Sequence, residues 1–243
     1  ANTATFRRAD DRDFFVGTAV GDSASADTTI KVALNVQPVY EIDLQRDAFD
    51  TVIVKTVVGS TTVEVPDVKS RGGCSYMLFG ATAEAQKVDL LSKKSFAVGS
   101  NWIVEGEFNV VDDGTGAAID FNIGVANATH ASDADLIAES CFLHLDGNVL
   151  DLFAESDDGV TEVAATDTTV NIVLGTPVHF VIDGRNPADI QIYVNGVLQL
   201  TATVFVLTAA VGPLKLLAHL EKSVDAMVGD YRVNYLRVRT MQQ

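Results

Sequence analysis

Two short segments in which apolar residues occupy every second position constrain the fold of this chain most strongly. They are residues 178–182 (VHFVI) and 190–194 (IQIYV). A period of two places one face of an extended strand on a core and the other face toward solvent or a second layer. The second segment ends at Asn195-Gly196, and this dipeptide is the strongest short signal for a β-hairpin. The pattern predicts antiparallel strands in a two-layer sandwich.

Segments of the same kind recur at intervals of roughly ten residues, which is typical of an all-β sandwich. Residues 81–91 (ATAEAQKVDLL) are rich in helix formers and predict a short helix. In the last strand, we expect Tyr231, Val233 and Tyr235 on one face and Leu236 and Val238 on the other. The predicted fold class is an all-β, antiparallel jelly-roll sandwich whose last strand lies beside its first. Further strands are expected at residues 14–16, 30–36, 39–44, 51–58, 61–65, 102–110, 118–125, 141–145, 149–155, 161–164, 169–173, 214–220 and 231–239.

The segment 66–73 resembles a linker and divides the chain into two predicted parts. Residues 1–70 would form an N-terminal arm with a small β module, and residues 71–243 would form the jelly-roll sandwich. Apolar residues make up 47% of the chain, which is enough for a sizeable core. Charged residues near the N-terminus interrupt any apolar run, so no secretion signal is expected. The longest apolar tract, residues 204–220, is broken by Gly212-Pro213 and predicts no membrane span.

Charge is distributed unevenly along the sequence. Residues 95–184 contain 16 acidic residues and no lysine or arginine, whereas the rest of the chain contains 17 acidic and 17 basic residues. The whole net charge of −16 therefore belongs to one continuous region. Such a region repels nucleic acid and anionic membranes, because binding to them relies on basic side chains. We interpret it as a solubilising face, with contact to a basic partner or to divalent cations as the alternative.

Glu105 and Glu107 are the first candidates for catalysis, because alternate residues of a strand share one face about 6.6 Å apart. This spacing overlaps the separation of paired glycosidase carboxylates. Glycosidases with a sandwich fold of this kind carry the pattern E-x-D-x-x-E. Here Glu107 stands in place of the middle Asp, and Val110 stands in place of the third acid. We therefore expect no catalytic residue and no enzymatic activity.

Acidic pairs are the candidates for a calcium or glycan contact. Calcium needs about six to eight oxygen ligands that converge from several segments. The dipeptides Asp113-Gly114 and Asp158-Gly159 instead favour ordinary turns. The residues retained as a glycan or calcium contact are Asp133, Asp135 and Tyr193, and the other pairs considered are Asp112-Asp113 and Asp157-Asp158.

The remaining reactive side chains do not form a recognisable site pattern. Cys74 and Cys141 are interpreted as small buried side chains, with a disulfide between them as the alternative. Trp102 fits a core position better than a platform for a sugar ring. No phosphate-binding loop, dinucleotide fingerprint or nucleophile elbow is present, and no cofactor or metal is expected. None of the four histidines has a cysteine or histidine at zinc spacing: His130, His144, His179 and His219.

Several segments resemble known families. Residues 178–197 resemble the concanavalin/laminin-G type of jelly roll, in which a strand V-H-F-x-I-D-G is followed by x-Y-V-N-G-V. Four other segments are similar to a family of proteins encoded in the structural gene clusters of tailed bacteriophages. The opening FFVGTAV, followed by TTIKVALN, is similar to the β-rich module of phage head-decoration proteins. The four segments are ADDRDFFVGTAV (9–20), LNVQPVYEIDLQRDAFDTV (34–52), FNIGVANATHASDADLIAES (121–140) and LKLLAHLEKS (214–223).

This second resemblance implies a capsid decoration or cement protein that binds and stabilises a phage head. It would be assembled in the host cytoplasm and located on the capsid surface of the virion. The major capsid protein would be its partner and a homotrimer its oligomeric state. The N-terminal arm, with one large apolar side chain among its first 13 residues, would order only when it docks on the shell. The predicted docking residues are Phe6, Arg7, Arg8, Arg12, Phe14 and Phe15.

A lectin-like glycan-binding module of a phage spike or tail, involved in host adsorption, is the alternative function. A free carbohydrate-active enzyme is the third. The same fold occurs in proteins with each of these three functions. The fold therefore limits the possible functions but does not identify one. Surface glycans are a possible partner, whereas nucleic acid and membranes are not expected.

Overall fold

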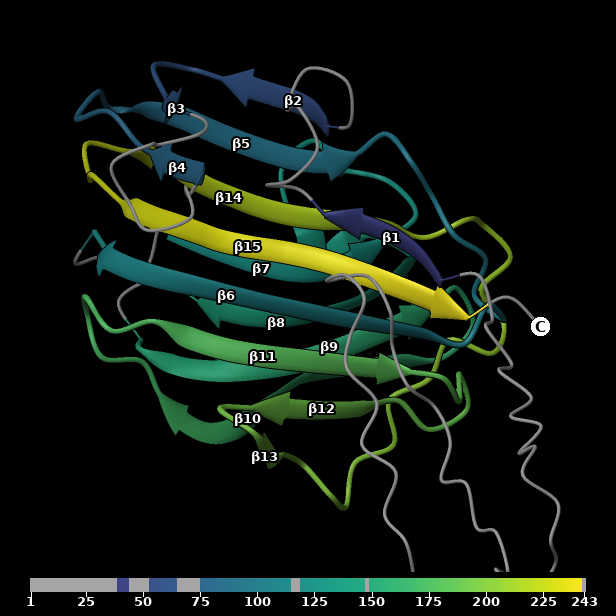
Figure 1. Ribbon diagram of the computed structural model, residues 1–243. Coiled ribbons are helices and arrows are strands. Elements are labelled where there is room, and N and C mark those ends of the chain that lie inside the picture. The colour runs from purple at the N-terminus through teal and green to yellow at the C-terminus, as the bar shows by residue number, and fades with distance from the viewer. Residues whose placement is uncertain (1–38, 44–52, 65–74, 115–118, 147–148, 242–243) are drawn as a thin grey trace, which may run out of the picture. The chain divides into compact units, whose positions relative to one another are not determined.

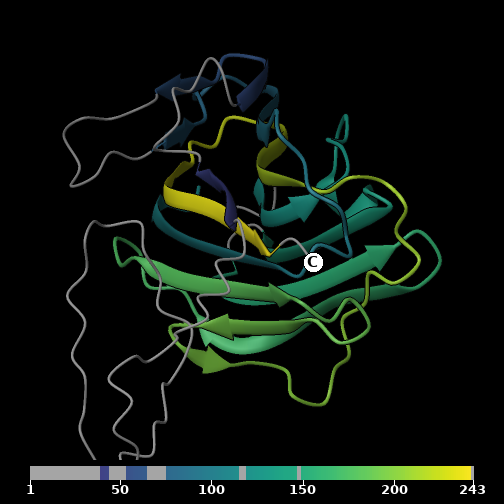
Figure 2. The same cartoon turned by 45° about the vertical axis from the view of Figure 1, so that its right-hand side comes forward.

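The computed structural model describes residues 39–43, 53–64, 75–114, 119–146 and 149–241. These residues belong to one compact unit that runs from Val39 to Gln243. They contain fifteen strands and one short 3₁₀ helix. The strands form two antiparallel sheets, called sheet A and sheet B, which lie in two layers (Figures 1 and 2).

Sheet A has eight strands and lies in front in Figure 1. Its strands follow the order β13–β12–β11–β6–β15–β4–β3, and β1 also pairs with β15. Their bounds are β1 (Val39–Asp43), β3 (Thr62–Glu64), β4 (Ser75–Leu78), β6 (Trp102–Asp112), β11 (Val178–Gly184), β12 (Gln191–Val194), β13 (Val197–Leu198) and β15 (Asp230–Met241).

Sheet B has seven strands in the order β10–β9–β8–β7–β14–β5–β2. The 3₁₀ helix η1 (Ala134–Leu136) lies in the connection between β7 and β8. The strand bounds are β2 (Ile53–Val58), β5 (Glu84–Ser92), β7 (Ile119–Ala126), β8 (Glu139–Asp146), β9 (Asp151–Asp158), β10 (Glu162–Asn171) and β14 (Lys215–Asp225).

One hydrophobic core fills the space between the sheets. In β6 and β11 every second residue is buried, so each strand presents one apolar face to the core. The ring of Phe108 in sheet A lies 5.4 Å from the ring of Phe121 in sheet B, which in turn lies 5.1 Å from Tyr231 in sheet A. These tilted ring contacts connect the two layers across the core.

The hairpin predicted at Asn195-Gly196 is confirmed. These two residues separate β12 from β13, and Val194 pairs with Val197 across the turn. Both have positive φ angles, 50° for Asn195 and 79° for Gly196. Positive φ at both central residues is the geometry that twists a two-residue turn in the sense of the flanking strands.

The helix predicted at residues 81–91 is wrong, because residues Glu84–Ser92 form strand β5. This strand pairs with β14 on one side and with β2 on the other. Val88 and Leu90 point into the core, while Lys87 and Asp89 alternate with them on the opposite face. Helix propensities among ordinary residues differ by less than about 1 kcal/mol each, so pairing with two strands and burial outweigh them.

The predicted faces of the last strand hold only for its first half. Tyr231 and Val233 are buried in the core, but so are Leu236 and Val238, while Tyr235 is half-buried on the outer face. The pairing of β15 with β6 shifts register between Val233 and Tyr235. A bulge of this kind inserts one residue and exchanges the two faces of the strand beyond it.

Residues 39–64 supply strands to both sheets, although the sequence places them in a separate N-terminal module. β1 pairs with β15, β2 with β5, and β3 with β4. The first and last of the described strands therefore lie side by side. The strands predicted at residues 14–16 and 30–36 lie outside the described residues.

Two smaller expectations concern the cysteines and the membrane. Cys141 is free and fully buried in β8, as expected for a small apolar side chain, while Cys74 lies outside the described residues. No helix among the described residues is long and apolar enough to cross a membrane.

Candidate functional site

The outer face of sheet B carries polar side chains that are nevertheless buried. Residues alternate along β7, so that Phe121 and Ile123 belong to the core while Asn122 points to the outer face. Asn122 is 1% exposed, and His144, directly opposite it on β8, is 6% exposed. His219 of β14 lies opposite Asn122 on its other side and has no exposed surface. The strand register thus aligns a row of buried polar side chains across the middle of the sheet.

The connection between β7 and β8 accounts for this burial, because it folds over the outer face. Asp133 is the N-cap residue of η1. Its carboxylate accepts a hydrogen bond of 2.9 Å from the backbone N–H of Asp135. Ala134 and Ile137 belong to a second hydrophobic cluster, outside the main core, with residues of β5, β7, β8 and β14. This small cluster anchors the connection and holds Asp135 beside the polar row.

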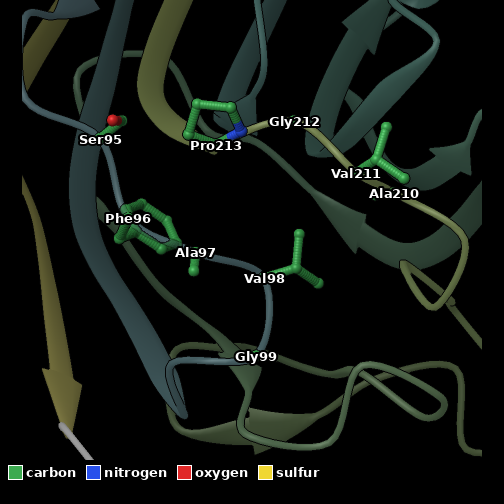
Figure 3. Close-up of a pocket in the computed structure, with 9 residues that line it drawn as sticks. All are labelled: Ser95, Phe96, Ala97, Val98, Gly99, Ala210, Val211, Gly212 and Pro213. Atoms are coloured by element: carbon green, nitrogen blue, oxygen red, sulfur yellow. The ribbon is translucent and has the colours of Figure 1, made fainter.

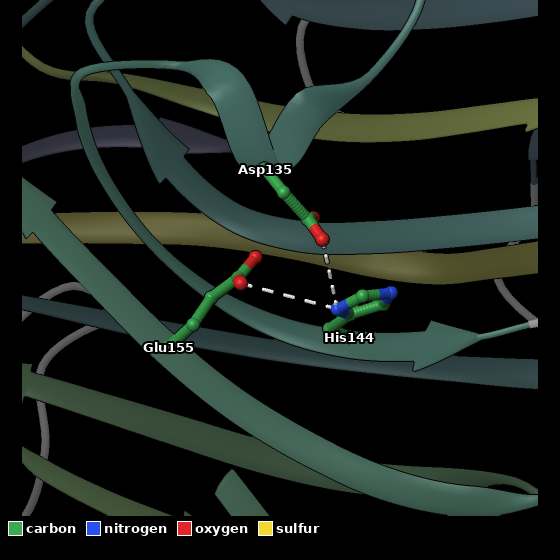
Figure 4. A group of neighbouring side chains, drawn as sticks. All are labelled: Asp135, His144 and Glu155. Carbon is green, nitrogen blue, oxygen red and sulfur yellow. Dashed lines mark ion pairs between the residues drawn. The ribbon is translucent and has the colours of Figure 1, made fainter. Parts of the chain in front are cut away.

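Five side chains converge at this position, and we call them the outer-face cluster: Asp120, Asn122, Asp135, His144 and Glu155 (Figure 4 shows the last three). His144 Nδ1 lies 3.4 Å from Asp135 Oδ2 and 3.9 Å from Glu155 Oε2. His144 Nε2 lies 3.7 Å from Asp120 Oδ1. Asn122 Nδ2 donates hydrogen bonds to Asp135 Oδ1 at 2.7 Å and to Glu155 Oε1 at 3.0 Å. One amide thus bridges two carboxylates that both face the same imidazole.

The charges of the outer-face cluster change the protonation of its members. Burial and the neighbouring Asp135 raise the pKa of Glu155 well above its ordinary range. Burial disfavours the charged form of His144, but Asp120, Asp135 and Glu155 outweigh it and raise the pKa of His144 to about 9. Within the cluster, one imidazole therefore faces three carboxylates, and negative charge is in excess.

Several buried polar atoms of the cluster have no hydrogen-bond partner in the part of the chain that the structure describes. They are Asp120 Oδ1, Asn122 Oδ1 and both ring nitrogens of His144. Buried polar atoms are normally paired, because an unsatisfied one costs about 1–3 kcal/mol. The side chains of Asp120 and Asp135 are 35% and 37% exposed. The cluster can therefore be reached by a ligand that offers hydroxyl groups or positive charge.

Phe153 adds an apolar surface next to the outer-face cluster. It lies on β9 directly opposite His144, and the two ring centroids are 6.5 Å apart. Its neighbours Leu152 and Ala154 belong to the core, so the half-buried ring points to the outer face.

A second charged group lies on the same face and is held together by ion pairs among its own members. His219 Nδ1 lies 2.5 Å from Asp89 Oδ1, and His219 Nε2 lies 2.8 Å from Glu221 Oε2. Burial lowers the pKa of His219, but these two carboxylates outweigh it and raise the pKa above its ordinary value. Lys87 Nζ lies 3.0 Å from Asp89 Oδ2 and donates to the backbone oxygen of His130. These contacts connect β5, β14 and the covering connection to one another. We therefore assign this group a structural role.

Glu105 and Glu107, the candidate catalytic pair, share the outer face of sheet A as predicted. Glu105 Oε2 accepts hydrogen bonds from Arg237 at 2.6 and 3.0 Å, and Glu105 Oε1 lies 3.2 Å from His179 Nε2. Glu107 accepts a hydrogen bond of 2.8 Å from Asn234. Burial raises the pKa of Glu105, but Arg237 and His179 outweigh it and hold that pKa below its ordinary value. A lowered pKa does not suit a general acid.

The structure separates the three residues that the sequence grouped as a glycan or calcium contact. Asp135 joins the outer-face cluster of sheet B, and Asp133 caps η1 next to it. Tyr193 alternates with the core residues Ile192 and Val194 and points outward from sheet A, on the opposite side of the sandwich. The predicted docking residues lie outside the described residues: Phe6, Arg7, Arg8, Arg12, Phe14 and Phe15.

The other acidic pairs form turns, as predicted. The backbone N–H of Gly114 donates to Asp112 Oδ1 at 2.9 Å, and that of Gly159 donates to Asp157 Oδ1 at 2.7 Å. Both glycines have positive φ, 79° and 83°. Asp158 accepts hydrogen bonds from backbone N–H groups of two separate segments. These carboxylates are occupied by the backbone.

A pocket of about 430 Å³ lies between the segments 95–99 and 210–213 (Figure 3). Ser95 is the only polar side chain in its lining, which contains no ionisable group. The pocket shares no residue with the outer-face cluster. Because its lining offers no charged side chain and only one side-chain hydroxyl group, the outer-face cluster is the stronger candidate site.

No protein-family model matches the sequence, and no curated protein matches it significantly. Solved structures do match. A protein of unknown function, SO2946 from Shewanella oneidensis, has a TM-score of 0.57 and 12% identity over 88% of this chain and 91% of its own. The carbohydrate recognition domain of Emp47p has a TM-score of 0.53 and 11% identity over 77% and 88% of the two chains. The alginate lyase AlgAT5 of polysaccharide lyase family 7 has a TM-score of 0.50 and 17% identity over 75% and 84%.

At these identities the comparisons establish the fold alone. The protein has a concanavalin-like, jelly-roll β-sandwich, and this is the fold class that the sequence predicts. A shared fold of this kind does not determine function, which has to be argued from the site.

The sequence identified Asp135 but missed its partners Asn122, His144 and Glu155. None of the histidines has a cysteine or histidine at zinc spacing, and a site with a single histidine leaves no such pattern. The available signal was a polar side chain at an outward position of each of three successive strands, β7, β8 and β9. That signal becomes specific only when the strand register places His144 opposite Asn122 and puts Glu155 two residues from Phe153, the partner of His144 on β9.

Proposed function

We propose that the protein binds carbohydrate through the outer-face cluster of sheet B. The observation that carries this proposal is the meeting of accessible carboxylates, Asp120 and Asp135, with buried polar atoms of Asn122 and His144 that form no hydrogen bond within the described part of the chain. Each sugar hydroxyl both donates and accepts hydrogen bonds. Carboxylate, amide and imidazole groups together match that chemistry, because they include both donors and acceptors.

Phe153 and the shared fold support this class of ligand. A half-buried ring beside a polar cluster offers an apolar surface for the C–H face of a sugar ring. Among the similar structures, the Emp47p domain is named a carbohydrate recognition domain and AlgAT5 is named for a polysaccharide that it cleaves. Carbohydrate ligands therefore occur on sandwiches of this architecture.

A glycan array followed by calorimetric titration of the strongest glycan tests the proposal. We expect Asp120→Asn to weaken binding roughly tenfold or more, because a hydrogen bond to a charged group contributes about 1.5–3 kcal/mol. Glu162→Gln is the matched control, since Glu162 is an exposed acid at the start of β10 outside the cluster. An array without a reproducible hit, or a hit that Asp120→Asn and Asp135→Asn leave unchanged, would refute the proposal.

Binding without turnover is part of the proposal. Assays for new reducing ends and for unsaturated sugar products, on the polysaccharides that bind, should show no activity. Turnover that Glu105→Gln abolishes would overturn this expectation and make the outer face of sheet A an active site.

We further propose a place for such a domain on a phage capsid, on the basis of the sequence resemblance to decoration proteins. Deletion of residues 1–13 should abolish binding to capsids and leave the thermal midpoint of the isolated protein unchanged. A deletion variant that still decorates capsids at full occupancy would refute the docking role of the arm.

A further inference from the structure

Three side chains at the centre of the outer-face cluster are spaced as ligands of one metal ion. A ligand atom of each of Asp135, His144 and Glu155 lies within 4.8 Å of the other two. The two distances from His144 Nδ1 are 3.4 and 3.9 Å. Ligands held about 2.1 Å from an ion lie about 3.4 Å apart in a tetrahedral arrangement and at most about 4.2 Å apart. Small side-chain rotations would bring all three to one ion (Figure 4).

The neighbouring residues already orient these side chains. Asn122 Nδ2 binds one oxygen of Asp135 and one of Glu155, so the second oxygen of each carboxylate faces His144 Nδ1. On the far side of the ring, Asp120 Oδ1 lies 3.7 Å from His144 Nε2. Histidines that bind a metal through one nitrogen typically have a carboxylate near the other, which fixes the tautomer and the ring orientation.

His144 is the independent observation that a ligand belongs at this position. It is more than nine-tenths buried, and neither ring nitrogen has a hydrogen-bond partner in the described residues. The ring points between Asp135 and Glu155 (Figure 4), whose carboxylates are separated by a single amide group. A cation bound to all three would satisfy the nitrogen and cancel the repulsion between the two carboxylates.

We propose that Asp135, His144 and Glu155 bind one divalent transition-metal ion, of the zinc or manganese class. One imidazole nitrogen and two carboxylate oxygens are ligands that suit such ions. Calcium and magnesium prefer sites made only of oxygen atoms. Three protein ligands leave coordination positions for water or for a hydroxyl group. The metal site stands without the carbohydrate proposal, although a sugar hydroxyl in an open position would connect the two.

Calorimetric titration of the chelator-treated full chain with zinc, manganese and calcium chloride in turn, without any glycan, tests this inference. We expect saturable binding of one ion per chain and a thermal midpoint that rises with the ion. Asp135→Asn and Glu155→Gln should each weaken binding at least tenfold and abolish the rise, whereas Glu162→Gln should behave as wild type. Asp135→Asn is expected to fold, because its side chain is 37% exposed and keeps the oxygen that accepts from Asn122. Unchanged tryptophan emission would verify this.

Four outcomes would overturn the metal site. Three of them are no saturable binding of zinc or manganese at millimolar concentration, binding that both cluster variants retain, and calcium binding tighter than zinc binding. The fourth concerns a variant on sheet A. His179→Gln tests one alternative site, because His179 forms an ion pair with Glu105 on sheet A. Loss of zinc binding in His179→Gln alone would likewise place the ion elsewhere. Since the titration contains no glycan, its result is separate from the result of the glycan array.

Discussion

The close contact of Gly184 with Trp102 makes a sharp test of how β11 pairs with β6. The two residues are direct partners in the antiparallel register. A Cβ atom at position 184 would lie 2.0 Å from Trp102 Cζ2 and 2.1 Å from Cε2. The indole ring cannot move aside freely, because it is fully buried, donates from Nε1 to the backbone oxygen of Val98 at 3.0 Å, and packs 5.7 Å from the ring of Phe96.

Gly184→Ala should therefore destabilise the fold by about 3 kcal/mol, at the upper end of the cost of overpacking a core. For a unit of this size, 1 kcal/mol lowers the thermal midpoint by about 2–4 °C, so the expected decrease is about 6–12 °C. Trp102 is the only tryptophan of the chain, and its fluorescence reports both the unfolding transition and the environment of the displaced ring.

Gly99→Ala is the matched control for this substitution. A Cβ atom at position 99 meets no atom within 4 Å, so the control should unfold at the wild-type temperature. If Gly184→Ala keeps both the wild-type midpoint and the wild-type emission spectrum, the register of β11 against β6 is refuted.

Three further predictions concern the outer face of sheet B and the outer face of sheet A. The bonds of His219 to Asp89 and Glu221 raise its pKa above 6.5, so they contribute fully below pH 6.5 and are lost as the pH rises through the folded-state pKa. Urea unfolding should show a free energy of unfolding that falls from pH 6 to pH 9, and a smaller fall in Glu221→Gln. Asn122→Asp replaces the donor to two carboxylates with a like charge and should lower the free energy of unfolding by about 3 kcal/mol in the same assay, while an unchanged value would contradict the bridging amide. Tyr193→Ala should leave glycan affinity unchanged in calorimetry, since Tyr193 lies on the side of the sandwich opposite the cluster, and a tenfold loss would move the site to sheet A.

Most of the fold could be predicted because its signals are local. Alternation at residues 178–182 and the Asn195-Gly196 turn each depend on a few adjacent residues, and both are found in the structure. The residues of β5 favour a helix locally, so the sequence predicts one there, and only the pairing of this segment with β14 and β2 makes it a strand. The bulge before Tyr235 was equally invisible, since it arises from the register with β6.

The candidate site depends even more on long-range register. Asp135 was selected from sequence as one of a pair of acids, yet its functional neighbours are contributed by three different strands. Asn122, His144 and Glu155 meet only because β7, β8 and β9 pair in one register and the connection carrying Asp135 folds back on them. The sequence groups Tyr193 with Asp133 and Asp135 only because these residue types suit a glycan contact. In the structure both sheets lie between Tyr193 and the two acids.

The origin of the outer-face cluster in one stretch of sequence has a practical consequence. All five residues lie between positions 120 and 155, on three consecutive antiparallel strands and the connection that covers them. Only β7 and β9 of this meander form strand pairs with the rest of sheet B, and the covering connection packs on β5 and β14 through a small apolar cluster. Changes in the covering connection should therefore alter the ligand preference, through Asp135, while the paired strands and their side chains stay fixed.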